Sequence, residues 1–316
     1  FFHWPQWAQV GLTTALSGAL WAAAGAGWGT NAASSPWMIT SLSLIPPVAL
    51  TYALRPDLGL ALVALTTPFY QQPDAMQRML SVPELLTLLC VVGMAKRVKI
   101  RRMRLSAIDL SYALLLGAAL VAAFFVADPA AAVYELRAVF LLPTVYYALL
   151  RLASLNARER RHIVNGWLLG ALAVALIGLA QYVTGRQLVI AEGGLPRMRS
   201  VYASPNNAGI YLGRMWPLFV AGTLWSEARA RRWLHAAALV PVTLALILSF
   251  SRGALLLGLP AAVLMMGWFA GGRYRRWALL FLAMEALAIL PLLQVPRFAS
   301  LLEIREGSTF FRLELW

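Results

Sequence analysis

The chain has 316 residues, of which 60% are hydrophobic and only 13% are charged, and its formal net charge is +14. Soluble domains average about 25% charged residues, so this composition excludes an ordinary soluble globular protein and indicates a membrane protein. A strongly basic chain can bind nucleic acid. Here, however, the arginines are spread over short loops between apolar stretches, as the positive-inside rule requires, and we expect no nucleic-acid partner. Cys90 is the only cysteine, which excludes a disulfide within the chain.

Apolar stretches of roughly 20 residues predict transmembrane helices, and the chain has about eleven of them. The sequence therefore predicts an all-α fold: a polytopic membrane helical bundle of about eleven or more helices, in which residues 1–316 form a single unit. Cys90 lies inside one of these stretches and is expected to be buried as a small hydrophobic residue. The expected spans are 9–26, 37–54, 58–72, 81–96, 107–127, 133–153, 163–184, 207–225, 234–250, 254–270 and 278–294.

Basic blocks alternate with the spans. They cover residues 96–104, 158–161, 229–232 and 273–276. An even number of predicted spans separates each block from the next, so all of the blocks fall on one side of the membrane. The positive-inside rule makes that side the cytoplasm. The loop 185–206, the turn 250–254 and the segment 296–316 are then expected on the opposite face.

The outer loop 185–206 carries two arginines, Arg197 and Arg199, after a turn rich in glycine and proline. Ser204 and Pro205 follow, and they predict an N-cap and the first residue of the next helix. The free N–H groups of that helix would point toward any anion that the arginines hold. The alternative is a solvated loop whose arginines contact lipid headgroups.

A second outer arginine site interrupts the apolar stretch 234–270. This stretch is too long for one span, so the chain is expected to turn at Ser251-Arg252-Gly253. Arg252 would then lie on the outer face at a tight hairpin. The alternative is that Arg252 only marks the membrane surface.

Charged residues also fall inside predicted spans, where a charge is costly and is a functional candidate by default. Pairing of these charges with one another inside the bundle is the structural alternative. They are Glu135, Arg137, Arg214 and Glu285. Two further acids, Glu84 and Asp109, each lie three residues after a serine, a pattern that predicts helix N-caps.

Three motifs follow one another on the segments assigned to the outer face. They are Arg199 with Pro205-Asn206 after a glycine-containing loop, Ser251-Arg252-Gly253-Ala254 at a hairpin, and Gly307-Ser308 followed by Arg312-Leu-Glu-Leu-Trp316. Their order, spacing and topology resemble those of the O-antigen ligase and O-antigen polymerase superfamily, over the part of the chain from about residue 160 to Trp316. The resemblance implies a GT-C-like membrane fold and transfer of a glycan from undecaprenyl diphosphate to an acceptor in the periplasm.

The arginines expected on the outer face suit the diphosphate of such a carrier, because guanidinium has a fixed charge and a planar fork. The residues predicted to bind the diphosphate are Arg199, Arg252, Arg312 and Arg197. The residues predicted to support the site are Asn206, Ser251, Arg137 and Arg214. In the family, an essential histidine follows the motif that ends here at Trp316. We therefore expect the protein to continue beyond Trp316 and the catalytic base to lie there.

The function predicted from the sequence is that of a bacterial inner-membrane glycosyltransferase, an O-antigen ligase, with its site facing the periplasm. It would join O-antigen to the lipid A-core sugar and invert the anomeric configuration, without ATP, metal or other cofactor. An O-antigen polymerase or a protein O-oligosaccharyltransferase of the same superfamily is the alternative. The alternative of another class is a transporter or flippase for a lipid-linked anionic solute, in which broken helices are expected at matching positions of two halves.

Overall fold

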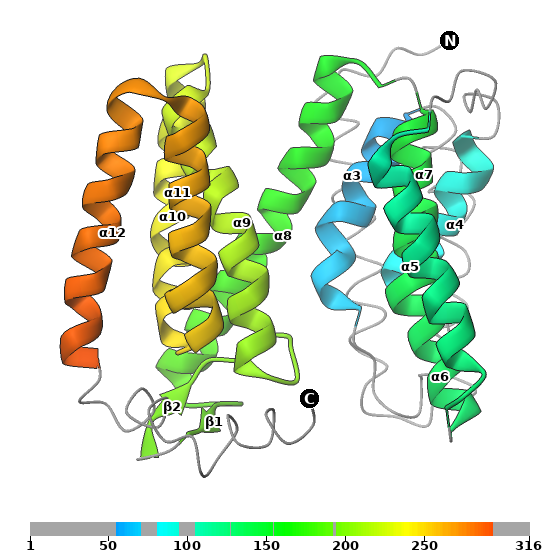
Figure 1. Ribbon diagram of the computed structural model, residues 1–316, viewed down its shortest axis with the longest axis horizontal. Coiled ribbons are helices and arrows are strands. Elements are labelled where there is room, and N and C mark those ends of the chain that lie inside the picture. Colours follow the sequence, from blue (N-terminus) through cyan, green and yellow to red (C-terminus); the bar gives the residue numbers. More distant parts are fainter. Residues whose placement is uncertain are drawn as a thin grey trace. The chain divides into compact units, whose positions relative to one another are not determined.

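The computed structural model describes residues 55–70, 81–94, 105–126, 128–153, 155–191 and 194–292. These residues are mostly helical, which confirms the predicted all-α class. The chain divides into two compact units, with the boundary between Trp167 and Leu168 inside helix α8 (Figure 1). The predicted spans 9–26 and 37–54 and the segment 296–316 lie outside the described residues. The single bundle over residues 1–316 stays a prediction.

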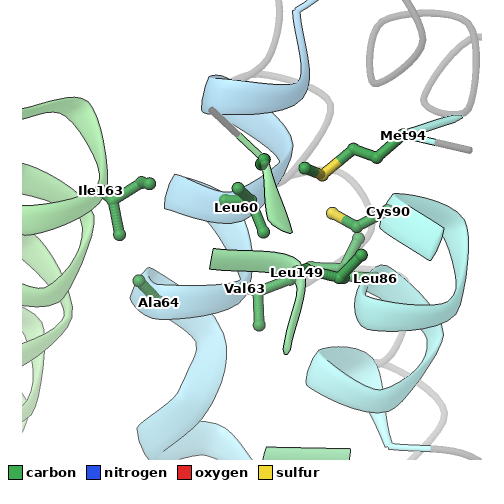
Figure 2. Close-up of a cluster of buried hydrophobic side chains, with 9 residues drawn as sticks. Leu60, Val63, Ala64, Leu86, Cys90, Met94, Leu149 and Ile163 are labelled. Carbon is green, nitrogen blue, oxygen red and sulfur yellow. The ribbon is translucent and has the colours of Figure 1, made fainter. Parts of the chain in front are cut away.

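Unit 1 is a set of helices around an apolar core. Its elements are α3 (Pro56–Thr66), the 3-10 helix η3 (Thr67–Phe69), α4 (Val82–Met94), α5 (Ala107–Ala123), α6 (Pro129–Glu135), the π-helix η6 (Leu136–Leu141), α7 (Leu142–Leu152) and the start of α8 (Ala157–Thr184). Leu60 of α3, Cys90 and Met94 of α4, Leu149 of α7 and Ile163 of α8 meet in one buried cluster (Figure 2). Cys90 is fully buried, as its apolar surroundings predicted.

Two acidic residues near the starts of unit 1 helices cap their own helix and also form an ion pair with an arginine. Asp109 forms a capping box with Ser106, as predicted, and its carboxylate also accepts a hydrogen bond from Arg151 at 2.9 Å. Glu84 accepts a hydrogen bond from the Ser81 N–H, also as predicted. It further pairs with Arg137, whose Nε lies 2.9 Å from Glu84 Oε1. This partner of Arg137 could not be predicted from the sequence.

Unit 2 contains the rest of α8 and two helical hairpins. Its other elements are β1 (Val189–Ile190), β2 (Pro196–Arg197), α9 (Pro205–Trp225), α10 (Arg229–Leu248), the π-helix η8 (Ala254–Gly258), α11 (Leu259–Ala270) and α12 (Gly272–Leu292). β1 and β2 pair antiparallel, with Val189 opposite Arg197. Helix α9 packs along α10, and α11 packs along α12 (Figure 1). Both hairpins close through short turns, at residues 226–228 and at Gly271.

A helix overlaps each predicted span from 58–72 onward. Within the described ranges, three helical stretches are long and apolar enough to cross a membrane, namely Pro129–Leu152, Ala157–Thr184 and Arg229–Leu248. Large apolar side chains on the helix surfaces are exposed, including Leu114 and Phe269 at 66% and 80%. Exposed apolar surface on this scale is typical of helices that contact lipid.

One expectation about helix positions was wrong. The basic blocks 158–161, 229–232 and 273–276 lie in the first turns of α8, α10 and α12 rather than in loops. Arginine is a good helix former, and no proline or glycine separates these blocks from the apolar residues that follow.

Candidate functional site at one end of unit 2

The loop 185–206 and the turn 249–252 meet at one end of unit 2, here called the loop end. The Met198 N–H donates a hydrogen bond to the carbonyl of Leu248 at 3.0 Å, which fixes the loop to the last turn of α10. On the other side, the Ser200 hydroxyl donates to the Val174 carbonyl of α8 at 2.6 Å. The loop that carries Arg199 and the turn that carries Arg252 are about 50 residues apart in the sequence, and they are therefore in contact in the structure.

Arg197 joins three segments at the loop end. Its side chain is buried, with 5% of the residue exposed. Its Nε donates to the carbonyl of Ser249 at 2.9 Å, and one terminal nitrogen donates to Asn206 Oδ1 at 2.7 Å and to the Phe250 carbonyl at 3.3 Å. Carbonyls at a helix C-terminus lack helical donors and carry partial negative charge, so they suit a cation. Arg197 therefore holds the hairpin strand β2 between the end of α10 and the start of α9.

The backbone of the loop end is strained. Among the described residues, three that are not glycine have positive φ angles: Gln187 at 55°, Ser200 at 53° and Phe250 at 44°. All three lie at the loop end. The left-handed region disfavours side chains with a Cβ, so such residues persist only where their surroundings hold them. Strain of this kind is concentrated at functional sites in many proteins, which makes the loop end the leading site candidate in the described part of the chain.

The turn 249–251 is seated tightly against α9. A Cβ added to Gly209 would lie 2.4 Å from the Ser251 Cβ and 2.7 Å from the Ser249 Oγ. Both serines are buried, at 0% and 2% exposed for Ser249 and Ser251. Only a glycine at position 209 lets the two backbones approach this closely. Gly209 was not among the predicted site residues, although its spacing of four residues from Gly213 is the small-residue pattern of close helix packing.

Two further predicted diphosphate ligands, Arg199 and Arg252, are also at the loop end, and both are half-buried. Arg199 Nε donates to the Gln187 carbonyl at 3.1 Å, which ties it to the start of the same loop. Arg252 begins the helical segment that continues into η8. The supporting residues Asn206 and Ser251 lie here as well, in contact with Arg197 and Gly209 as described.

The start of α9 agrees with its predicted cap. Ser204 is the N-cap, its hydroxyl accepts a hydrogen bond from the Asn206 N–H at 3.2 Å, and Pro205 occupies the first helical position. The Asn207 and Ala208 N–H groups donate to the Ser204 carbonyl, so the first turn of α9 is capped by this serine. The start of α9 still carries the partial positive charge of a helix N-terminus. The loop end therefore combines a helix N-terminus with two half-buried arginines, a combination that suits an anion.

The remaining predicted residues are elsewhere. Arg312 lies outside the described residues. Arg137 belongs to unit 1, where it pairs with Glu84 and lies over the Tyr134 ring, 5.8 Å from its centroid. Arg214 is exposed near the middle of α9 and forms no ion pair with the described residues. The supporting role of both arginines stays a prediction.

Within the described ranges, no group of three or more histidine, cysteine, aspartate or glutamate side chains is arranged to hold a metal ion. The described part of the chain is thus helical, with three helical stretches suited to a membrane and a cluster of arginines at one end of unit 2. No protein-family model, curated protein or solved structure matches the chain.

Proposed function

We propose that the protein is a membrane glycosyltransferase that moves a glycan from undecaprenyl diphosphate to an acceptor hydroxyl. The proposed reaction is that of an O-antigen ligase, with the lipid A-core sugar as acceptor. The observation that supports it most is the meeting of two sequence motifs, Arg199 with Pro205-Asn206 and Ser251-Arg252, at one strained, tightly packed end of unit 2. These motifs are the ones that resemble the O-antigen ligase and polymerase superfamily.

The chemistry needs a cationic site more than a nucleophilic side chain. The acceptor oxygen attacks the anomeric carbon, its proton passes to a general base, and the bond from that carbon to the diphosphate oxygen breaks. Undecaprenyl diphosphate leaves with the bonding electron pair, and a single displacement inverts the anomeric configuration. Charge therefore grows on the diphosphate, and fixed cations at this point stabilise the transition state more than the ground state.

Arg252 and Arg199 are the proposed diphosphate ligands, and Arg197 is proposed as a positioning residue. Arg197 donates hydrogen bonds to the turn that contains Arg252 and to Asn206 in the first turn of α9. The lipid carrier supplies an activated bond, so the proposal requires no ATP. Guanidinium groups would replace the divalent cation that many diphosphate-dependent transferases use.

The proposed setting is the bacterial inner membrane, with the loop end facing the periplasm in a GT-C-like bundle of about eleven or more helices. The three helices suited to a membrane and the exposed apolar surface of α5 and α11 support this setting. The arginine-rich turns 226–232 and 271–276 lie at the other end of the helices of unit 2, away from the loop end. The positive-inside rule favours the cytoplasmic face for such turns.

The proposal is tested by glycan transfer with purified protein in detergent and excess chelator. Lipid-linked glycan is mixed with lipid A-core, and initial rates are compared for the wild type, Arg252→Ala and Arg252→Lys. Loss of one preorganised donor at a developing charge lowers the rate by about 10²–10³-fold. We expect that loss for Arg252→Ala and a partial recovery for Arg252→Lys, because lysine keeps the charge but lacks the fork.

The matched control is Arg186→Ala, which removes an exposed arginine of the loop 185–206. It is expected to transfer glycan at the wild-type rate. Transfer by Arg252→Ala at the wild-type rate would show that Arg252 only marks the membrane surface. Use of a second carrier-linked glycan or of a protein as acceptor would indicate a polymerase or a protein O-oligosaccharyltransferase. Movement of lipid-linked glycan across sealed vesicles, with no transfer in detergent, would indicate a transporter.

A further inference from the structure

The opposite end of unit 2 contains two turns that lie beside each other, residues 226–232 and residues 271–276, here called the turn end. The ring centroids of Trp225, before the first turn, and Tyr274, in the second, are 5.5 Å apart. Gly267 of α11 packs closely on the start of α12, since a Cβ there would be 3.0 Å from the Tyr274 carbonyl oxygen and 2.3 Å from the Ala278 Cβ. The first turns of α10 and α12 therefore present their side chains on one surface.

This surface carries a dense, unneutralised positive charge. Its arginines are Arg229, Arg231, Arg232, Arg273, Arg275 and Arg276. Glu227 is the only acid in the two turns, and none of these arginines forms an ion pair with the described residues. The N-terminus of a helix already carries partial positive charge, so arginines in the first turn weaken α10 and α12 rather than stabilise them. An anion at these helix starts would offset this unfavourable interaction.

Aromatic rings hold two of these guanidinium groups in place. The Arg275 guanidinium carbon lies 3.6 Å from the centroid of the Trp268 ring, and an Arg273 terminal nitrogen donates to the Tyr274 hydroxyl at 3.2 Å. A guanidinium stacked on a ring keeps its N–H edge available for a second acceptor. The positive-inside rule requires only that basic residues be present, whereas this stacking fixes where one of them lies.

Tryptophans around the same surface indicate the depth at which it lies. Trp225, Trp233, Trp268 and Trp277 are 45%, 67%, 56% and 61% exposed. Exposed tryptophans near the ends of apolar helices typically lie at the level of lipid headgroups. The arginines of the turn end are then at the depth of the lipid phosphates.

We propose that the turn end binds the phosphate of an anionic glycerophospholipid. The headgroup phosphate would accept hydrogen bonds from arginines of both turns, and the tryptophan rings would lie along the glycerol and upper acyl region. A zwitterionic lipid has the same phosphate but also an ammonium group, which the surrounding arginines repel. The bound class is therefore a lipid with net negative charge, such as phosphatidylglycerol. This inference does not rest on glycosyl transfer.

Lipid binding is measured with the purified, delipidated chain in a neutral detergent. Short-chain phosphatidylglycerol and phosphatidylcholine are titrated separately, and bound lipid is counted by native mass spectrometry. We expect phosphatidylglycerol to bind at least tenfold more tightly. Each arginine near an anionic headgroup contributes about fivefold in affinity, so Arg275→Gln should weaken binding about fivefold and Arg232→Gln/Arg275→Gln about 25-fold.

The matched control is Arg186→Gln, an exposed arginine at the loop end. Its affinity for phosphatidylglycerol should stay within about twofold of the wild type. Equal binding of the two lipids, or an equal loss for Arg186→Gln and Arg275→Gln, would overturn the proposal. Displacement of phosphatidylglycerol by millimolar inorganic phosphate would also overturn it, in favour of a site for free phosphate. Thermal unfolding of Arg275→Gln should match the wild type, which separates loss of binding from loss of folding.

Discussion

The two ends of unit 2 use the same side chain in opposite ways. At the loop end, Arg197 is buried, and its donors reach the Ser249 and Phe250 carbonyls and Asn206. At the turn end, the arginines are mostly exposed and form no ion pair with the described residues, and Arg273 and Arg275 lie over aromatic rings. Arg197 thus uses its donors to join segments of the chain, whereas most of the turn-end arginines face the surroundings.

The largest expected effect that separates the two ends is on stability. Arg197→Ala removes the donor from buried acceptors, and each buried acceptor left without a donor costs about 1–3 kcal/mol. We expect a clearly lower midpoint of thermal unfolding in a fixed detergent. Arg275→Ala at the turn end should leave that midpoint nearly unchanged, because its side chain is exposed. Equal midpoints for the two variants would remove the distinction between the ends.

A second effect concerns the packing that seats the turn 249–251. In Gly209→Ala, the new Cβ would meet the Ser251 Cβ at 2.4 Å, whereas in Gly213→Ala the nearest atom is the Ala254 Cβ at 3.6 Å. Overpacking costs about 1–3 kcal/mol. We expect Gly209→Ala to lower the unfolding midpoint and, under the proposed function, the rate of glycan transfer.

Gly213→Ala is the matched control, one helical turn further along α9. Its contact distance is ordinary, and alanine is about 0.5–1 kcal/mol more favourable than glycine inside a helix. Its unfolding midpoint should equal or exceed that of the wild type. A Gly209→Ala protein as stable as Gly213→Ala would contradict the close seating of the turn on α9.

The smallest expected effect concerns how helices begin at the two ends. At the loop end, Ser204 caps α9, and Ser204→Ala should cost about 1 kcal/mol. At the turn end, α10 begins after Ala228 with no side-chain cap, so Ala228→Ser should gain about 0.5–1 kcal/mol. A lower unfolding midpoint for Ser204→Ala and a higher one for Ala228→Ser, each relative to the wild type, would confirm the difference. A loss of stability in Ala228→Ser would mean that the turn 226–228 constrains the helix start.

Features that depend on neighbours in the sequence could be predicted. Apolar runs located the helices, Ser204 and Pro205 marked the start of α9, and Ser106 with Asp109 marked that of α5. Each of these signals acts within one or two helical turns, where spacing alone decides which groups can meet.

Features that depend on packing could not be predicted. Arg197 and Ser249 are 52 residues apart, and Arg137 and Glu84 are 53 apart, so only the folded chain brings each pair together. The sequence favoured Arg197 as a ligand of an anion because loop arginines are usually accessible. It contained no signal that the C-terminus of α10 would supply carbonyls for the same guanidinium.

The buried position of Arg197 also sets an order for assembly during synthesis. Its acceptors at Ser249 and Phe250 are made 52 and 53 residues later, which at about 5–20 residues per second is a delay of roughly 3–10 seconds. Throughout this interval, the guanidinium has neither carbonyl available and must stay hydrated or contact lipid phosphates. Closure of the loop end is therefore a late event in the biogenesis of unit 2, completed only after α10 has been synthesised and its last turn has formed.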